Sequence, residues 1–494
     1  MNRAIARLAL VGTGLMVALV VATTYWQAWA AGDLADRQDN QIQRVAQFTI
    51  ERGEILAAQP RRVLARNQPR KVGGRTLYFR RYPTDGLAAH VVGYSTQERE
   101  RAGLERARND YLIAANQNLS TVVNRTIDEL KGATVQGNDL VLTLNMRAQE
   151  VAMRALDGRC GSVVALEPAT GKVLVMASFP TFDQNVIAED FSAIDRITAP
   201  CKPAAPLYNR ATYGLYAPGS IFKVVTAAAA LESGRYTAES RFDDPGYCEV
   251  YGRRVNNYDT TSPFGNVDLR QALVNSINSV FCNIGKELGA GAIIDQAKRF
   301  GFYETPPLET PDNERVASGL YEGGKLFDPD VDSDVDAGRF AFGQERLLVT
   351  PLQMAMVAAG VANNGVVMKP QVVDRILSPK GSIVVRAKPD ELGRAVKQET
   401  AGTIASMMQE AVESGTGTAA RISGLVVGGK TGTAETGVEG TNNAWFICFA
   451  GPEGERPQVA IAVVLEQQNG TGGVLAAPIA REVMQALLPE AANS

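Results

Sequence analysis

The longest apolar stretch of this 494-residue chain runs from about residue 8 to residue 30 and follows two arginines, Arg3 and Arg7. It is long enough to cross a bilayer as one helix, which takes about 20 residues. Aromatic residues stand at its far end, where their rings favour the membrane interface: Tyr25, Trp26 and Trp29. Because the arginines come first, the positive-inside rule predicts a cytoplasmic N-terminus and an exported chain from residue 31 onward. The sequence therefore predicts a single-pass protein of the cell membrane, with residues 1–30 as its cytoplasmic tip and transmembrane anchor.

A cleaved signal peptide is the alternative interpretation of the same stretch. Ala28-Trp29-Ala30 fits the A-x-A cleavage pattern. The length of the stretch favours the uncleaved anchor, because the apolar core of a signal peptide is shorter. Both interpretations export the rest of the chain.

The charge balance and the cysteines argue against several classes of function. Lys and Arg number 50 against 53 Asp and Glu, and the net charge of −3 offers no basic footprint for nucleic acid. The cysteines form no C-x-x-C pair and no cluster with histidine, which argues against a zinc or redox site. Outside the cytoplasm two of them can pair, but the sequence does not choose which. The five are Cys160, Cys201, Cys248, Cys282 and Cys448.

His90 is the one histidine of the chain. It precedes an apolar segment and lies well before the motif-rich part of the chain, so we interpret it as a structural residue. A catalytic serine or cysteine in this chain therefore needs a base other than imidazole, which argues against Ser-His-Asp and Cys-His designs.

The length predicts more than one domain, and the composition changes near residue 150. Residues 31–150 are polar and rich in Arg and Gln, with an extended segment at 76–79, a polar helix at 119–130 and a strand at 139–144. We identify no nucleophile with a partner there. This part is therefore predicted to be a small non-catalytic module, for dimerisation or as a pedestal.

Residues 151–494 show strands at both ends and helices between them. The predicted strands are 162–166, 172–176, 444–449 and 459–465, and the predicted helices are 221–231, 269–287, 351–362, 401–413 and 478–488. Turn sequences such as Glu-Pro-Ala-Thr-Gly join the strands as hairpins. This order predicts an α+β fold, an antiparallel sheet built from both ends of the domain with helices packed on it.

Ser220 and Lys223 stand at the start of the first predicted helix. Pro218 and Gly219 break structure before it, serine is a favoured first residue, and the three-residue spacing places both side chains on one face. The neighbouring residues are apolar or small, so burial is expected to lower the pKa of Lys223 and let it accept the Ser220 proton. The structural alternative is a lysine that extends from a helix end to water, with Ser220 as a cap.

Ser276 and Asn278 interrupt an amphipathic pattern some fifty residues later. Serine and asparagine form helices poorly, so a local loop or cap explains an isolated S-x-N. In a site, the hydroxyl suits a proton relay and the amide suits a substrate peptide group.

Lys430-Thr431-Gly432-Thr433 is the third polar motif and follows an apolar run and two glycines. Glycine on an edge strand permits close approach of the backbone to a ligand. The lysine and the hydroxyls suit a substrate carboxylate, and strand N–H groups suit an oxyanion. A simple turn is the alternative for the motif taken alone.

In this order, S-x-x-K at Ser220, S-x-N at Ser276 and K-T-G at Lys430 resemble the motif set of penicillin-binding proteins and serine β-lactamases. The segment at Arg52-Gly53 resembles the one that follows the anchor in class B penicillin-binding proteins, and the segments 343–344 and 350–353 resemble their region between the second and third motifs. The resemblance covers most of residues 45–490. The short N-terminal module and compact length resemble the actinobacterial penicillin-binding protein A branch.

The resemblance implies a peptidoglycan D,D-transpeptidase with a serine acyl-enzyme. Ser220 attacks the D-alanyl-D-alanine carbonyl or a β-lactam, Lys223 takes its proton, and Ser276 helps to pass a proton to the leaving amine. An amine of a neighbouring stem peptide then attacks the acyl-enzyme and forms the cross-link. No metal or organic cofactor is implied.

The same resemblance implies the binding residues and partners. Asn278 holds the substrate backbone, Lys430 and Thr431 act on the terminal carboxylate, and the N–H groups of Ser220 and Thr433 form the oxyanion hole. Gly432 is counted with the substrate-binding residues of the K-T-G motif. The implied partners are peptidoglycan stem peptides, β-lactam antibiotics and a membrane glycan polymerase.

Three other functions use or mimic the same site. A class A β-lactamase carries S-D-N and a water-activating glutamate, whereas this chain has Ile277 in the middle position and no E-x-x-L-N segment after it. A D,D-carboxypeptidase differs only in its acceptor, which the sequence does not specify. The third is a non-catalytic β-lactam sensor or scaffold, against which the complete motif set argues.

Overall fold

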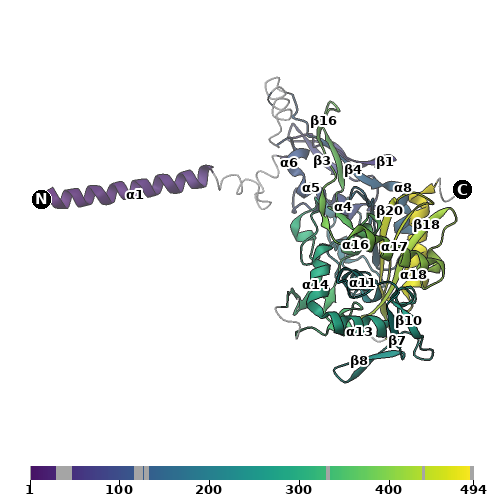
Figure 1. The fold of residues 1–494 in the computed structure, drawn as a ribbon. Coiled ribbons are helices and arrows are strands. Elements are labelled where there is room, and N and C mark those ends of the chain that lie inside the picture. The colour runs from purple at the N-terminus through teal and green to yellow at the C-terminus, as the bar shows by residue number, and fades with distance from the viewer. Residues whose placement is uncertain are drawn as a thin grey trace.

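The computed structural model describes residues 2–28, 47–115, 126, 133–329, 334–436 and 440–489. The first helix, α1 (Asn2–Ala28), projects away from the rest of the molecule (Figure 1). Within it, Ile5–Tyr25 is the one segment of the described chain that is long and apolar enough to cross a membrane, and no part of this window is buried in the protein. The predicted apolar span is therefore helical up to Ala28 and exposed over residues 5–25, and its last two residues, 29 and 30, lie outside the described residues.

A five-stranded antiparallel sheet forms the centre of the larger part of the molecule, in the order β18-β19-β20-β5-β6. Its strands are β5 (Gly161–Leu166), β6 (Val173–Phe179), β18 (Leu425–Glu435), β19 (Asn442–Pro452) and β20 (Val459–Gln468). Each of the four predicted strands overlaps one of these. The predicted α+β fold, with a sheet built from both ends of the domain, is confirmed.

Helices cover both faces of this sheet, because successive strand side chains point to opposite sides. Phe446 and Cys448 pack with α8 (Met146–Leu156) and α18 (Gly472–Leu487). Trp445, Ile447 and Phe449 face the other core, which contains α11 (Lys223–Glu232) and α16 (Pro351–Ala362). α17 (Gln398–Glu413) packs against β18.

The helix α16 begins and ends where the sequence predicts. The Thr350 side chain accepts a hydrogen bond from the Gln353 N–H at 3.1 Å, and Pro351 occupies the first turn, where its missing N–H costs nothing. The whole helix is buried, which its uniformly apolar sequence allows.

Three helix predictions need correction. The predicted helix 269–287 is two helices, α12 (Leu269–Val274) and α13 (Asn278–Leu288), because Ser276 adopts a left-handed φ of 60° that ends the first. Ser220 does not cap a helix, since it lies in the 3-10 turn η1 (Gly219–Phe222) that precedes α11. The last helix begins at Gly472, six residues before the predicted start at Pro478, with that proline inside it.

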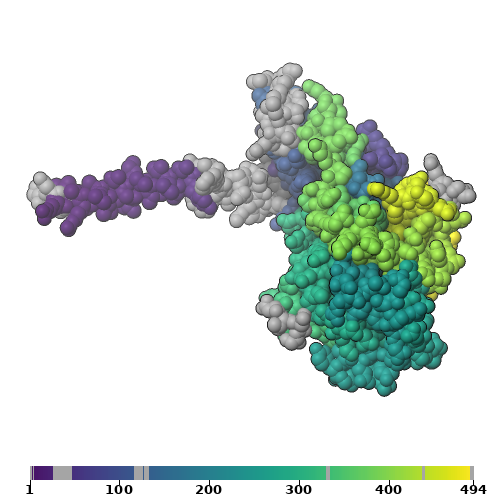
Figure 2. Space-filling view, in the orientation of Figure 1, coloured from purple at the N-terminus to yellow at the C-terminus, as the bar shows by residue number. Residues whose placement is uncertain are grey.

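A second, six-stranded sheet joins the N-terminal part of the chain to a distant segment, in the order β16-β15-β4-β1-β2-β3. Its strands are β1 (Ile55–Gln59), β2 (Arg61–Val72), β3 (Arg75–Arg81), β4 (Asp139–Asn145), β15 (Val373–Leu377) and β16 (Ile383–Arg386). β4 pairs in parallel with β1 and antiparallel with β15. Figure 2 shows the green surface that includes β15 and β16 directly beside the blue and purple of the N-terminal strands. The predicted helix 119–130 lies outside the described residues apart from residue 126.

A buried charge cluster lies beside this sheet. The Glu105 carboxylate, fully buried, receives Arg52 Nε and Arg80 Nε, each at 2.7 Å. Arg52 also donates to Asn109 Oδ1 at 2.6 Å, and Arg80 to the Gly53 carbonyl at 2.8 Å. The cluster ties the Arg52-Gly53 segment to β3 and to the short helix α5 (Gly103–Ala107).

The remaining elements are short. They are α4 (Ala89–Val92), α6 (Asn109–Leu112), α9 (Val186–Glu189), α10 (Ser192–Asp195), β7 (Arg241–Asp244), β8 (Tyr247–Val250), β9 (Arg253–Asn256), β10 (Gly265–Asp268), α14 (Ala290–Arg299), η2 (Asp312–Glu314), β11 (Gly319–Glu322), β12 (Lys325–Leu326), α15 (Ala337–Phe340), β13 (Leu347–Leu348), β14 (Val366–Met368), β17 (Glu391–Arg394) and η4 (Thr418–Ala420). Two disulfides are present, Cys160–Cys201 and Cys248–Cys282, and Cys448 is a buried free cysteine. The pairing of these cysteines could not be predicted from the sequence.

Candidate active site

Ser220 lies in the turn η1, which packs directly against the edge strand β18. The turn is fixed by Gly219 N–H, which donates to the Gly343 carbonyl at 2.9 Å, and by Trp445 Nε1, which donates to the Ala217 carbonyl at 3.0 Å. Ser220 itself is half-buried, and among the described residues its hydroxyl forms no hydrogen bond. The serine is thus presented on a rigid turn with its hydroxyl unengaged.

Glycines allow the turn to come this close to the strand. A Cβ atom on Gly343, whose φ is +79°, would lie 2.0 Å from the Gly219 carbonyl oxygen. A Cβ atom on Gly432 would lie 2.9 Å from the Pro218 carbonyl oxygen, and one on Gly219 2.8 Å from that of Thr433. The backbone of the K-T-G motif is therefore in contact with the backbone that carries Ser220.

Lys223 is completely buried one turn after Ser220, at the start of α11. Its Nζ donates to the Ser276 carbonyl and to Asn278 Oδ1, both at 2.7 Å, and lies 3.3 Å from Ser276 Oγ. No carboxylate of the described residues forms an ion pair with it. Burial lowers the pKa of Lys223 well below its usual value, and the nearby Lys430 charge lowers it further. A lysine in this position can act as a base.

The backbone break at Ser276 brings the second motif to the lysine. Ser276 lies between α12 and α13 with its left-handed φ of 60°, so that both its carbonyl and its hydroxyl meet Lys223 Nζ. Asn278 is held by a second contact, from its Nδ2 to the Asn256 carbonyl at 3.0 Å. Behind the motif, the buried Asp244 carboxylate accepts from Ser279 Oγ and Asn257 Nδ2.

Lys430, also fully buried, approaches the same serine from β18. Its Nζ donates to Ser276 Oγ at 2.8 Å and to the Thr431 carbonyl at 3.1 Å. Burial lowers the pKa of Lys430 to about 7. Ser276 Oγ therefore contacts two lysine amines, one from α11 and one from β18, and burial lowers the pKa of both.

The hydroxyls of Thr431 and Thr433 extend the site along β18. Thr431 Oγ1 is 2.7 Å from Thr416 Oγ1, and Thr433 Oγ1 accepts a long hydrogen bond, 3.5 Å, from the Gly472 N–H. Sequence reasoning missed Thr416, although Gly415 and Gly417 on either side of it mark a tight loop. It also missed Trp445, whose one signal was a tryptophan inside an otherwise aliphatic strand.

All three motifs predicted from the sequence are thus brought together. Lys223, Ser276, Asn278 and Lys430 form one hydrogen-bonded group, and Ser220, Gly432 and Thr433 adjoin it through the contact between η1 and β18. His90 has no part in it. It is buried in α4 with its Nε2 2.8 Å from the Pro206 carbonyl, and burial lowers its pKa to about 4, so it is neutral.

Comparisons with known proteins agree with this geometry. Residues 161–485 match the family model of the penicillin binding protein transpeptidase domain, and residues 52–140 match the penicillin binding protein A dimerisation domain. The chain belongs to the class B penicillin-binding proteins. The prediction from the three motifs is confirmed at the level of the family.

Relatives of this penicillin-binding protein match most or nearly all of its length. Peptidoglycan D,D-transpeptidase PbpA of Mycolicibacterium smegmatis is 34% identical and covers 99% of this chain and 100% of its own. Penicillin-binding protein A from M. tuberculosis, solved as a ceftriaxone acyl-enzyme complex, superposes with a TM-score of 0.80 at 32% identity, covering 90% of this chain and 100% of its own. MrdA of Acinetobacter baumannii, also named a peptidoglycan D,D-transpeptidase, is 27% identical over 83% of this chain and 66% of its own.

Proposed function

We propose that this penicillin-binding protein is a peptidoglycan D,D-transpeptidase in which Ser220 is the nucleophile. It cross-links stem peptides through a serine acyl-enzyme and is acylated by β-lactams at the same serine. One observation carries the residue roles: Lys223 is buried, no carboxylate of the described residues pairs with it, and its amine meets the Ser276 hydroxyl that Lys430 also contacts.

The acylation step follows from these positions. The Ser220 oxygen attacks the carbonyl between the two D-alanines while its proton passes to neutral Lys223. The N–H groups of Ser220 and Thr433 receive the oxyanion that develops. The carbon–nitrogen bond then breaks, and the leaving D-alanine amine takes a proton from Lys223 by way of the Ser276 hydroxyl. The products are free D-alanine and a peptidyl ester of Ser220.

Substrate binding uses the remaining residues. The Asn278 side chain holds the backbone of the donor peptide, and the charge of Lys430 with the Thr431 hydroxyl acts on its terminal carboxylate. Because Gly432 has no side chain, the donor peptide can lie close beside β18. It can add there as a further strand, since β18 is at the edge of the sheet. The amine of a second stem peptide then attacks the ester, forms the new amide and returns the proton to Ser220.

The placement of the protein follows from α1. We propose that α1 is a single-pass anchor with a cytoplasmic N-terminus, which holds residues 151–494 outside the cytoplasm as the catalytic domain. Residues 31–150 serve as a non-catalytic dimerisation or pedestal module. A membrane glycan polymerase is the partner that would supply the strands to be cross-linked.

The deciding experiment is intact-mass spectrometry of the full-length protein in detergent, incubated with penicillin and followed for hours. We expect one drug adduct that persists on the wild type and is absent from Ser220→Ala. Ser233→Ala, at the C-terminal end of α11, the helix that follows η1, is the matched control and should be acylated like the wild type. An adduct lost within seconds would identify a β-lactamase, and no adduct on folded protein would contradict the enzyme assignment.

The acceptor is tested separately with a stem-peptide donor that ends in D-alanyl-D-alanine, with and without a second peptide that offers a side-chain amine. A cross-linked product supports the transpeptidase. Release of D-alanine at an equal rate with and without the amine, and no cross-link, would identify a D,D-carboxypeptidase.

A further inference from the structure

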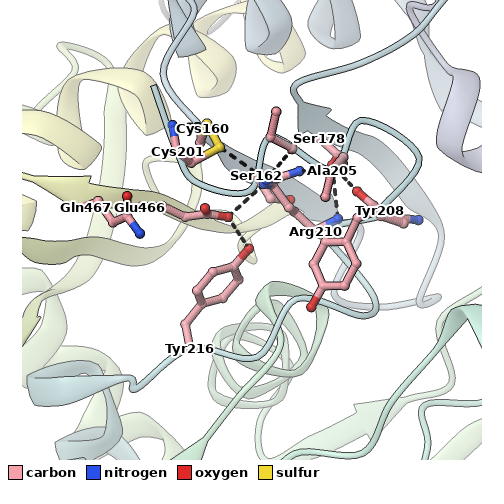
Figure 3. Close-up of polar contacts among 12 residues, drawn as sticks. Cys160, Ser162, Ser178, Cys201, Ala205, Tyr208, Arg210, Tyr216, Glu466 and Gln467 are labelled. Atoms are coloured by element: carbon pink, nitrogen blue, oxygen red, sulfur yellow. Dashed lines mark hydrogen bonds and ion pairs between the residues drawn. A yellow bond between two sulfur atoms is a disulfide. The ribbon is translucent and has the colours of Figure 1, made fainter. Parts of the chain in front are cut away.

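A closed ring of contacts lies beside the chain that leads to Ser220, and the mechanism above does not use it. Arg210 is at its centre (Figure 3). Its Nε donates to Glu466 Oε1 at 2.7 Å, and its Nη2 lies 2.9 Å from the Ala204 carbonyl and 3.3 Å from Cys201 Sγ. Both partners of the ion pair are nearly buried, with side-chain exposures of 3% for Arg210 and 13% for Glu466.

The disulfide completes the ring. Cys201 is bonded to Cys160, which directly precedes β5, and the Glu466 N–H donates to the Cys160 carbonyl at 2.9 Å. Cys160, Cys201, Arg210 and Glu466 therefore hold one another, so the loop before the nucleophile is fastened to β5 and β20. Cys160, Cys201 and Glu466 lie close enough together to hold a metal ion, but both sulfurs are bonded to each other in the disulfide. Glu466 is then the one ionisable ligand of the three, which argues against a metal site.

Tyr216 connects this ring to the nucleophile. Its hydroxyl donates to the same Glu466 Oε1 at 2.5 Å, and it lies four residues before Ser220. Its backbone pairs with Val349, and its ring stands edge-on to Trp445 with centroids 6.0 Å apart. Trp445 in turn donates to the Ala217 carbonyl and pairs with Gly432 across β18 and β19.

Glu466 Oε1 thus accepts two hydrogen bonds, one from the Arg210 guanidinium and one from the hydroxyl of Tyr216, in the segment that leads to Ser220. Moving that oxygen moves Tyr216, and Tyr216 stands at the start of the five-residue path to Ser220. Burial, followed by the Glu466 charge, raises the pKa of the Tyr216 hydroxyl, so it stays protonated and remains a donor.

We infer that Glu466 and Tyr216 are positioning residues for acylation, and that Arg210 and the Cys160–Cys201 disulfide hold them in place. The inference rests on the proposed function of Ser220. It implies that the disulfide, although it belongs to none of the three motifs, affects the rate at which Ser220 is acylated.

The test separates drug binding from acylation by stopped-flow kinetics with a fluorescent penicillin. Tyr216→Phe removes the hydroxyl and keeps the ring on Trp445. We expect its limiting acylation rate to fall about tenfold, with little change in the dissociation constant of the noncovalent complex or in the pH of the rising limb. Tyr213→Phe is the matched control, because the Tyr213 hydroxyl has no hydrogen-bond partner among the described residues, and its rate should equal the wild type.

Coupling to the disulfide is tested by a double-mutant cycle between Tyr216→Phe and Cys160→Ala/Cys201→Ala. If both act through Glu466, the combined loss of acylation rate is smaller than the product of the separate losses. Should the cysteine variant not fold, Glu466→Asp, which withdraws the carboxylate, replaces it in the cycle, which then tests the coupling of Tyr216 to Glu466.

Two results would overturn the inference: Tyr216→Phe acylated at the wild-type rate, or losses that multiply independently. These results differ from a failure of the proposed function, in which the wild type itself would not be acylated.

Discussion

At the scale of single residues, the site concentrates two buried lysines on one serine hydroxyl. Lys223 and Lys430 are both fully buried, and Ser276 Oγ lies 3.3 Å and 2.8 Å from their amines. A buried ammonium is costly without a carboxylate partner, so each lysine is held in a state that favours loss of its proton. A neutral lysine amine is what a base for Ser220 needs, and the burial that lowers its pKa costs folding free energy whenever the amine is charged.

The pH dependence of acylation should report this arrangement. Acylation needs neutral Lys223, so its rate should rise with pH as Lys223 loses its proton. The Lys430 charge lowers the pKa of Lys223. In Lys430→Met that repulsion is gone, and we expect the rising limb to move to higher pH while the plateau rate falls. The measurement is the second-order acylation rate constant from pH 5 to 10; a limb that moves to lower pH would contradict the assignment.

The same substitution should stabilise the fold at low pH. The pKa of Lys430 is about 7 when folded and roughly 10.4 when unfolded, so the unfolded chain binds more protons between these values. Wild-type stability therefore rises with pH across this window, and the full cost of the buried charge is present below it. We expect Lys430→Met to be about 2 kcal/mol more stable than the wild type at pH 6, after its lost hydrogen bonds, with a smaller gain at pH 9. Urea unfolding at the two pH values measures this; an equal gain at both would be inconsistent with a charge penalty.

At the scale of elements, the site depends on how closely η1 approaches β18 and the loop at Gly343. Gly343 has the left-handed φ that glycine favours, and its Cα lies against the carbonyl that precedes Ser220. Any side chain there must push the nucleophile turn away from the K-T-G strand.

Gly343→Ala should therefore damage both activity and stability. We expect a loss of about 100-fold in the acylation rate, because the nucleophile shifts relative to Lys223, and a loss of about 1–3 kcal/mol in unfolding free energy. Gly402→Ala is the control: Gly402 lies within α17 with no atom near its missing Cβ, so the change should stabilise by about 0.5–1 kcal/mol. Wild-type acylation in Gly343→Ala would show that the close approach is not needed.

The elements also show what the sequence could predict. α16 was predicted to the residue, because its capping threonine, proline and apolar run are local signals. The break between α12 and α13 lies inside the predicted helix 269–287, although a local loop was the structural alternative given for Ser276 and Asn278. The left-handed Ser276 is stabilised by contacts with Lys223 and Lys430, which come from other parts of the chain, so its backbone conformation has no local signal. The three motifs were predicted from the sequence, whereas Thr416 and the disulfide pairs depend on the fold.

At the scale of the whole molecule, the N-terminal module and the catalytic part share a sheet. β15 and β16 leave the catalytic part and extend the module's sheet through β4. Pairing between strands more than two hundred residues apart leaves no periodic signal, so the sequence predicted β4 and missed its partner β15. The charge cluster of Arg52, Arg80 and Glu105 holds the other side of the same module.

Removing the carboxylate of this cluster should destabilise the module strongly. Glu105→Gln leaves two buried guanidinium groups without a counter-charge, and we expect a loss of about 3–5 kcal/mol in unfolding free energy. Glu150→Gln breaks the exposed pair with Arg62 and should cost less than about 1 kcal/mol. Thermal and urea unfolding compare the two, and Ser220 acylation of the folded Glu105→Gln protein should stay near the wild-type rate. Equal stability of the two variants would contradict a structural role for the cluster.

The shared sheet has a mechanical consequence. With α1 as the proposed anchor and Ser220 esterified to a stem peptide, the protein is a covalent tether between the membrane and the wall. Tension that enters from α1 reaches β1, whose neighbours are β2 on one side and the parallel β4 on the other. The hydrogen bonds of both ladders run across the strands, so a force along β1 loads them in shear and all at once. The sheet therefore resists the load as a unit instead of opening one bond at a time.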